Sequence, residues 1–161
     1  MIVVSDTSPI TSLPAVGQLH LLQQLYNSII IPQAVYDEMT SLDYPVPGAV
    51  EVQTLPWIQT RQVTNLVLVR QFQTELDEGE SEAIALALEL QADLLVIDEY
   101  PARKVASRLG LNIVGVLGVF LNAKRRSLIP TVKPVMDDLI VQANFRIGEQ
   151  LYADILQFAG E

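Results

Sequence analysis

Ile2-Val3-Val4-Ser5-Asp6, at the start of the chain, is a short apolar run that ends in a carboxylate. The same pattern returns far along the sequence as Leu94-Leu95-Val96-Ile97-Asp98. Short continuous runs of Val, Ile and Leu are typical of strands that are buried on both faces, as in parallel sheets. We therefore expect two central, adjacent strands with Asp6 and Asp98 at their carboxyl ends.

Strand and helix patterns alternate along the rest of the chain. Further strands are expected at residues 28–31, 57–63 and 112–116. Helices are expected at 10–26 (with a break at Pro14 or Gly17), 32–39, 48–53, 65–76, 80–91, 101–109, 117–127, 131–144 and 148–159, with Asp77-Glu78-Gly79 as a turn. This alternation predicts a single α/β domain over residues 1–161, with three α/β/α layers around a central, mostly parallel sheet.

The composition excludes several kinds of site. Half of the 161 residues are hydrophobic, which is enough for one substantial core. Because there is no cysteine, no disulfide, thiolate nucleophile or cysteine-based zinc site can form. The only histidine, His20, lies in an apolar segment that reads as an ordinary helix. The sequence has neither a signal peptide nor an apolar run long enough to span a membrane, so we expect a cytoplasmic protein.

The overall charge is unfavourable for nucleic acid. A net charge of −9 opposes nonspecific binding, which depends on neutralising phosphates. Basic residues nevertheless gather in two places, Arg103-Lys104 with Arg108, and Lys124-Arg125-Arg126. Local charge, rather than the total, decides where an anion binds. The second group lies near an expected helix end, where cations complement the helix dipole.

Four acidic residues, far apart in sequence, follow apolar runs or begin expected helices. They are Asp6, Glu38, Glu80 and Asp98. Because the carboxyl ends of parallel strands face one crevice, we expect these carboxylates to gather there. Oxygen-only acidic pockets hold Mg²⁺ or Mn²⁺, and such ions are the usual means of cutting phosphodiesters in water.

Each acid also has a purely structural interpretation. Asp6 is a good helix cap, and Glu38 suits a solvated helix face. Glu78, Glu80 and Glu82 would complement a helix N-terminus, as would Asp98 and Glu99. Taken together these interpretations are less convincing, because Asp6 and Asp98 end strands that should be neighbours. Paired carboxylates repel and raise each other's pKa unless a cation lies between them.

These blocks resemble the PIN domain, the small metal-dependent nuclease domain of bacterial toxin–antitoxin ribonucleases. The segment Ile2 to Pro9 is similar to the family's apolar strand followed by Asp-x-Ser. Ile30 to Met39 is similar to its second block, in which a helix after a strand and a proline carries an acid, here Glu38. Glu80 to Asp98 resembles the third and fourth blocks. Segments such as Gly115-Val116-Leu117-Gly118 and the tail from Phe145-Arg146 extend the resemblance over nearly the whole chain.

The resemblance implies a metal-dependent ribonuclease that acts on single-stranded RNA as the toxin of a toxin–antitoxin pair. It implies that Asp6, Glu80 and Asp98 hold Mg²⁺ or Mn²⁺, with Glu38 acting through water or on a second ion. Neighbouring residues expected to orient these groups or to contact substrate are Ser8, Glu82, Glu99 and Arg103. Arg103 would contact a phosphate or pair with a site carboxylate, and a plain surface position is its alternative. The third acid is often Asp in the family, whereas here it is Glu80 or Glu82.

Other functions fit the sequence less well. The first strand is not followed by Gly-x-Gly-x-x-Gly, and no phosphate-binding P-loop motif exists. A phosphatase with an aspartate nucleophile typically uses Asp-x-Asp, but residue 8 is serine. A non-catalytic PIN-like module that binds RNA or a partner protein remains an alternative.

The resemblance also implies an antitoxin partner and a homodimer. Leu117, Val119, Phe120 and Leu121 make one expected helix apolar on nearly every side, and Ile10, Leu13 and Val16 are apolar beside the first strand. Helices of this kind are buried either in the core or against another chain. Both interpretations are open from the sequence.

Overall fold

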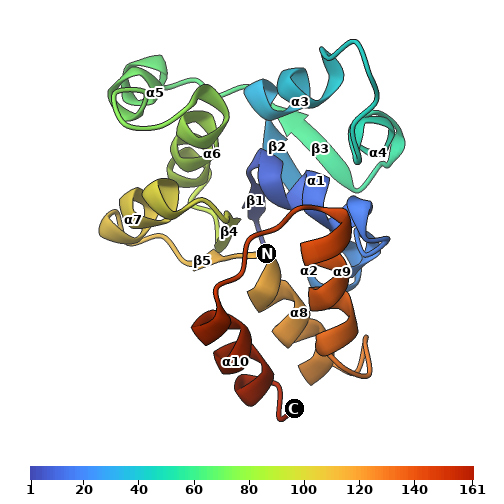
Figure 1. Ribbon diagram of the computed structural model, residues 1–161. Coiled ribbons are helices and arrows are strands. Elements are labelled where there is room, and N and C mark those ends of the chain that lie inside the picture. Colours follow the sequence, from blue (N-terminus) through green and yellow to red (C-terminus); the bar gives the residue numbers. More distant parts are fainter.

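The sheet of the computed structural model, which describes residues 1–161, contains five strands, and every pairing between them is parallel. The strands are β1 (Val3–Ser5), β2 (Ile29–Pro32), β3 (Ile58–Arg61), β4 (Leu94–Val96) and β5 (Ile113–Val114), in the order β3-β2-β1-β4-β5 (Figure 1). In the register of β1 and β4, Val4 pairs with Leu95 and Ser5 pairs with Val96. The predicted pairing of the two apolar runs at the sheet centre is confirmed.

Helices cover both faces of the sheet and complete the predicted three layers (Figure 1). One core contains side chains from α1 (Thr7–Ala15), α2 (His20–Tyr26), α3 (Gln33–Thr40), α4 (Ala49–Thr54), α8 (Val116–Arg125), α9 (Lys133–Gln142) and α10 (Glu149–Phe158). The other contains side chains from α5 (Leu66–Phe72), α6 (Glu78–Glu89) and α7 (Tyr100–Arg108). Val3 and Val96 belong to the first core, whereas Val4 and Leu95 belong to the second, because successive strand residues point to opposite faces. None of the helices is long and apolar enough to cross a membrane.

One predicted helix boundary is confirmed, and another differs from the sequence prediction. The expected helix at 10–26 is two helices, with the break at Gly17, whose φ of +71° is a conformation that glycine adopts without strain. Pro14 lies near the end of α1 and does not break it. Asp77-Glu78-Gly79 is not a free turn, because Asp77 caps α6 and the helix begins at Glu78. The Asp77 and Glu80 side chains each accept a hydrogen bond from the other's backbone N–H, which satisfies two N–H groups at the helix start.

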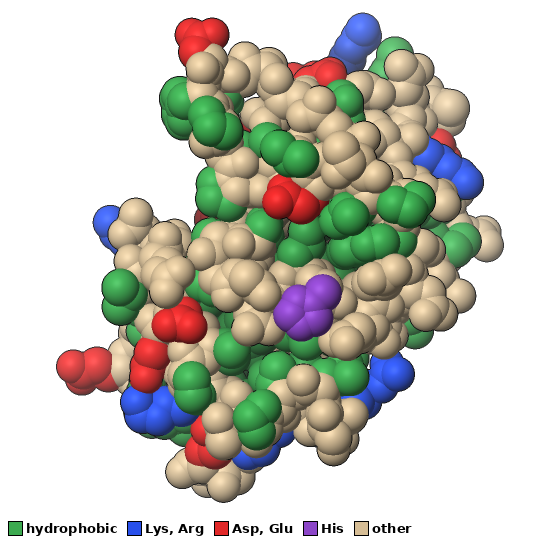
Figure 2. Space-filling model, turned by 90° about the vertical axis from the view of Figure 1, so that its right-hand side faces the viewer, with side chains coloured by type: hydrophobic (Ala, Val, Ile, Leu, Met, Phe, Trp, Pro, Cys, Tyr) green, Lys and Arg blue, Asp and Glu red, His purple; other side chains and the backbone are tan.

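The apolar helices considered as a dimer surface lie inside the monomer. Val119 and Phe120 of α8 are fully buried, and so are Ile10 and Leu13 of α1. The interpretation of these residues as a surface between two chains was therefore wrong, since the core of the same chain covers them. His20 is exposed and lies on the face shown in Figure 2, beside Leu19 and Trp57.

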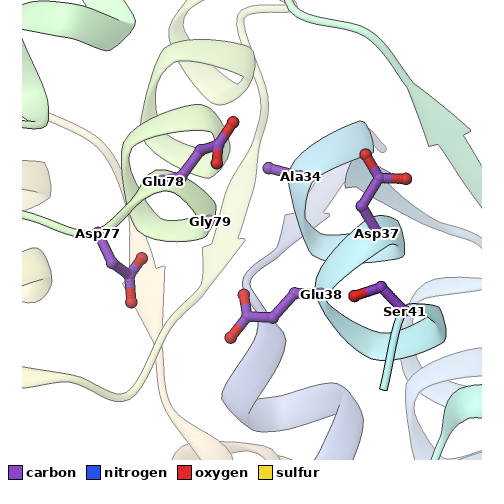
Figure 3. A pocket seen from close by; sticks show the side chains of 7 residues that line it. All are labelled: Ala34, Asp37, Glu38, Ser41, Asp77, Glu78 and Gly79. Carbon is purple, nitrogen blue, oxygen red and sulfur yellow. The ribbon is translucent and has the colours of Figure 1, made fainter. Parts of the chain in front are cut away.

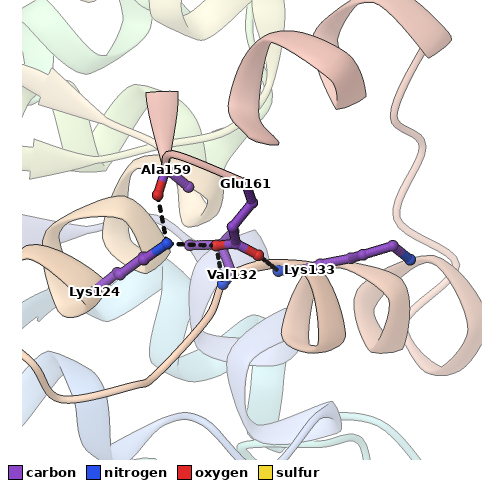
Figure 4. Close-up of polar contacts among 5 residues, drawn as sticks. All are labelled: Lys124, Val132, Lys133, Ala159 and Glu161. Atoms are coloured by element: carbon purple, nitrogen blue, oxygen red, sulfur yellow. Dashed lines mark hydrogen bonds and ion pairs between the residues drawn. The ribbon is translucent and has the colours of Figure 1, made fainter. Parts of the chain in front are cut away.

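The Glu161 carboxylate joins three of the C-terminal helices (Figure 4). Its Oε2 atom accepts hydrogen bonds from Lys124 Nζ of α8 at 3.0 Å and from the Val132 backbone N–H at 2.7 Å. Its Oε1 atom accepts from the Lys133 backbone N–H at 3.1 Å. Lys124 Nζ also donates to the Ala159 carbonyl. One carboxylate thus caps the start of α9 and ties it to α8 and α10.

We expect Glu161→Gln to lower the free energy of unfolding by about 1 kcal/mol at pH 7, because a neutral amide is a weaker acceptor for these donors. Hydrogen bonds, first that from Val132, hold the pKa of Glu161 below its usual range. This stabilisation is therefore complete above the unfolded pKa and is lost as pH falls through the folded pKa. Urea denaturation at several pH values measures it. Asp43→Asn, in an exposed loop, is the control, and equal stability of Glu161→Gln and wild type at pH 7 would contradict the capping role.

Candidate functional site

A polar pocket of about 520 Å³ lies at the carboxyl end of β1, between the starts of α1, α6 and α7. We call it the central pocket; its lining residues are Asp6, Thr7, Ser8, Thr11, Glu38, Asp77, Glu80, Glu99 and Pro101. Three of the four predicted acids, from three separate elements, therefore line one pocket. No lysine or arginine lines it, so no side chain there neutralises the acids.

Asp6 is the most deeply buried acid of the chain. Its backbone N–H donates to the Val96 carbonyl at 3.0 Å, which extends the β1–β4 pairing by one residue. Only 3% of Asp6 is exposed. Burial, with smaller contributions from the negative charges of Glu80, Asp77 and Glu38, raises the pKa of Asp6 to about 8. Asp6 occupies the cap position of α1 but makes no capping hydrogen bond with its side chain, so the simple capping interpretation does not account for it.

Glu38 reaches the pocket from α3 and is held by Thr7. The Thr7 hydroxyl donates to Glu38 Oε2 at 2.9 Å. Gly79 of α6 lies against both groups: a β-carbon at this position would stand 2.9 Å from Glu38 Oε2 and 3.5 Å from Asp6 Oδ1. A β-carbon there would push the Glu38 carboxylate aside, whereas its distance from Asp6 is an ordinary van der Waals contact, so glycine lets α6 approach Glu38 closely.

Glu80 has two roles at once. One carboxylate oxygen, Oε1, accepts the Asp77 backbone N–H at 3.1 Å in the capping box of α6. The side chain also lines the central pocket and is buried. Burial raises its pKa, and the negative charges of Asp77 and Glu99 add to this effect. The structural interpretation of Glu80 is therefore correct, and it is compatible with a place in the site.

A second pocket of about 370 Å³ adjoins the central pocket between α3 and α6, and we call it the acidic pocket. Its lining residues are Ala34, Asp37, Glu38, Ser41, Asp77, Glu78 and Gly79. Figure 3 shows the Glu38 carboxylate extending from α3 into the space beside α6, and Asp77 at the start of α6; both residues line both pockets. No lysine or arginine lines the acidic pocket either.

Asp98 lies next to the central pocket rather than in it. It lines a neighbouring pocket of about 460 Å³, with Ser8, Thr11 and Glu99 in common with the central one. Asp98 Oδ1 accepts the Val116 backbone N–H at 2.9 Å, whereas Oδ2 is buried without any hydrogen-bond partner. Burial raises the pKa of Asp98 to about 6, against the opposing charge of Arg103.

Gly115 provides the space for Asp98 and Arg103. A β-carbon at position 115 would stand 2.7 Å from Asp98 Oδ1 and 3.0 Å from Arg103 Nη1. Arg103 is half-buried, and its Nη1 donates to the Ile97 carbonyl at 2.8 Å. It forms no ion pair with Asp98 and lines none of the pockets around Asp6. Arg103 thus binds the backbone just after β4 and does not face the pockets around Asp6. This position differs from the predicted phosphate contact.

The other predicted neighbours have separate places. Ser8 lines the central pocket, and its hydroxyl donates to Glu99 Oε1 at 3.2 Å. Glu99 lines both the central pocket and that of Asp98. Glu82 lines neither, because Oε1 accepts the Ala34 backbone N–H at the start of α3. Between the two candidate third acids, only Glu80 reaches the pocket.

Sequence reasoning did not identify Asp77 or Thr7 as site residues. Asp77 was assigned to a turn, and Thr7 was not among the predicted site residues. The capping box spacing from Asp77 to Glu80 was a usable signal for the start of α6. No local signal indicated that Thr7 would bond to Glu38, because 31 residues separate the two.

The residues present fit a divalent cation. The donor set consists of carboxylate and hydroxyl oxygens, which Mg²⁺ and Mn²⁺ prefer. Asp6 is buried among other acids, and Asp98 Oδ2 is a buried oxygen with no partner. Both are conditions that a cation would relieve. As the side chains are arranged, no three acidic or histidine residues converge on one point, so binding would require rotation of side chains such as that of exposed Glu38.

Comparison with known proteins identifies the family. No curated protein matches the chain. Among solved structures, the chain is similar to a PilT N-terminus domain protein from the hyperthermophilic archaeon Sulfolobus solfataricus P2, with 16% sequence identity and a TM-score of 0.47 over 92% of this chain and 99% of the other. A family model described as a PIN domain matches residues 2–161. The match spans the sheet, the helices on both faces and every acid of the site, and this chain therefore belongs to the PIN-domain family.

Proposed function

We propose that this chain is a metal-dependent endoribonuclease that hydrolyses phosphodiester bonds in single-stranded RNA. PIN domains are generally nucleases that use divalent metal ions. The observation that carries the proposal is the burial of Asp6 beside Glu38 and Glu80 in a pocket that no lysine or arginine lines. A carboxyl whose pKa is about 8 is mostly protonated at neutral pH. It becomes a ligand there only when a metal ion replaces its proton.

In this proposal Asp6, Glu80 and Asp98 hold Mg²⁺ or Mn²⁺, and Glu38 acts through water or on a second ion. A divalent ion held there would activate water for attack and offset negative charge on the phosphate. The remaining contacts orient these ligands. Thr7 fixes Glu38 through its hydroxyl, and the capping box with Asp77 fixes Glu80 and leaves one of its oxygens toward the pocket. Such supporting hydrogen bonds hold ligands in place and tune their basicity.

The biological setting rests on the resemblance alone. It supports a cytoplasmic toxin of a toxin–antitoxin pair, with an antitoxin protein as partner and a homodimer as the active form. The alternative is a non-catalytic PIN-like module that binds RNA or a partner protein. One observation favours this alternative: no three acids converge as ligands in the present arrangement. An assay of cleavage separates the two.

We expect the purified chain to cut single-stranded RNA with Mn²⁺ and to lose at least about 100-fold in rate in Asp6→Asn, the loss typical of one preorganised charged group. Several RNAs should be incubated with and without Mn²⁺, and the products separated by gel. Asp43→Asn makes the same chemical change in an exposed loop and should cut as the wild type does. Absence of cleavage by the wild type on all RNAs would favour the non-catalytic module.

We expect millimolar Mn²⁺ to raise the melting temperature by about 4–8 °C, since an ion that binds only the folded site stabilises it. Differential scanning fluorimetry with Mn²⁺, and with EDTA as the reference, measures the shift. It should disappear in Asp6→Asn and persist in Asp43→Asn. A shift of equal size in all three proteins would place the ion elsewhere.

The metal-free protein should lose stability as pH rises, and Asp6→Asn should lose less. Because burial raises the pKa of Asp6 from 3.8 to about 8, the folded state binds this proton more tightly than the unfolded state does. The stability that the bound proton of Asp6 contributes is fully present below the unfolded pKa and is lost as pH rises through the folded pKa. Between pH 5 and 8 we expect the stability of wild type to fall by about 2–4 kcal/mol more than that of the variant. Urea denaturation in EDTA checks this; parallel pH curves would contradict it.

A further inference from the structure

The surroundings of the central pocket differ in charge from side to side. The acidic pocket brings Asp37 and Glu78 to the same place as Glu38 and Asp77. The two other adjoining pockets are each lined by an aromatic side chain and at least one basic side chain. One lies on α7 and shares Pro101 with the central pocket. The other shares Ser8, Thr11 and Glu99 with it and lies under residues 143–148, the linker between α9 and α10.

The α7 side presents Tyr100, Lys104 and Arg108 at four-residue spacing, which places them on one helix face. Tyr100 is 71% exposed. Lys104 Nζ lies 5.6 Å from the centre of the Tyr100 ring. Arg108 lies 3.6 Å from a Glu75 carboxylate oxygen, which partly neutralises it. Tyr100 and Lys104 are therefore the aromatic ring and the uncompensated charge nearest the central pocket on this side.

The linker side presents Phe145 and Arg146. Phe145 is half-buried against the larger core, and its backbone N–H donates to the Leu139 carbonyl at 3.1 Å, so its position is fixed. Arg146 is exposed, and its guanidinium makes no hydrogen bond or ion pair within the chain. The chain has 19 acidic and 10 basic residues. Arg146 has no acidic partner even so, and it lines the pocket of Asp98 and Glu99. Its charge is therefore available to a ligand there.

We propose that a single strand of RNA crosses the central pocket from Tyr100 and Lys104 on α7 to Phe145 and Arg146 on the linker, and keeps away from the acidic pocket. This proposal rests on the ribonuclease function proposed above. It adds the path of the substrate across the central pocket and the distribution of charge along that path. Proteins bind single strands by stacking bases on aromatic rings while cations follow the backbone. The carboxylates of the acidic pocket repel a polyanion from the third side.

The same geometry selects unpaired substrate. Bases in a duplex are stacked on one another and are not free to stack on Tyr100 or Phe145. A phosphate held by Lys104 and another held by Arg146 would leave the intervening phosphodiester over the Asp6 pocket, since the two flanking pockets adjoin it. Two cations on the path also compensate locally for the unfavourable net charge.

Binding of a fluorescent RNA of roughly ten nucleotides, a length in the range of single-strand sites, tests the path. Fluorescence anisotropy should be measured with Ca²⁺ in place of Mn²⁺, because Ca²⁺ also takes oxygen ligands, and the RNA should be checked for integrity. We expect Lys104→Gln and Arg146→Gln each to weaken binding about tenfold, and each to reduce the salt dependence by about 0.7 in log–log slope. Tyr100→Ala should weaken binding by a similar factor, without a change in slope.

Matched controls lie outside the path. Arg125→Gln, at the end of α8, and Lys133→Gln, paired with Asp137 on α9, should leave the affinity unchanged. In Mn²⁺ assays, the path variants should raise KM and leave kcat near the wild-type value. The path is overturned if Lys104→Gln and Arg146→Gln both bind RNA as the wild type does, or if a duplex of the same sequence binds equally well. In that case cleavage by the wild type would still support the ribonuclease. Binding that depends on these residues without any cleavage supports the path and overturns the ribonuclease.

Discussion

The parallel pairing of β1 with β4 is the constraint on which the site depends. It sets Ser5 beside Val96, and the hydrogen bond from Asp6 to the Val96 carbonyl continues the pairing past the strand end. Two acids that are 92 positions apart, Asp6 and Asp98, are thereby brought to one edge of the sheet, because parallel strands end on the same side. The helices that leave this edge, α1, α6 and α7, then bring Thr7, Glu80 and Glu99 to the same place.

This arrangement places charge where it destabilises the metal-free fold. Burial raises the pKa values of Asp6, Glu80 and Asp98, so folding makes each of these carboxyl groups harder to ionise. By contrast, Glu161 accepts three hydrogen bonds, and its pKa is lowered. Because the buried Asp6 side chain makes no capping hydrogen bond, the stability of the fold does not explain its placement, whereas Glu80 also supports the start of α6. Strained or destabilising groups of this kind are concentrated at functional sites.

The acidic net charge and the proposed substrate are compatible because charge acts locally. The acids gather at the central and acidic pockets, whereas Lys104 and Arg146 stand on the two other sides of the central pocket. A bound divalent ion would add positive charge at the centre of the same groove. Many of the remaining basic residues are engaged within the chain: Lys124 bonds to Glu161, Lys133 to Asp137 and Arg126 to the Leu25 carbonyl. The basic run at 124–126 thus has mainly a structural role, as its place at a helix end indicated.

The sequence by itself determined the layered α/β fold, the two central strands and the PIN-domain family, because apolar runs, helical spacing and strand-end acids are local patterns. It also predicted that Asp6, Glu38, Glu80 and Asp98 would gather in one crevice, since these acids follow strands or begin helices. The first three line the central pocket, whereas Asp98 lines the adjoining one. Tertiary structure alone decided which neighbours complete the site. It turned the Glu82 side chain of α6 toward the backbone N–H of Ala34 on α3, bonded Arg103 to the Ile97 carbonyl, and brought Glu99 to the pocket. Residues one helical turn apart or side by side in sequence point in different directions, and only the packing of α3, α6 and α7 around the sheet edge determines which of them meet.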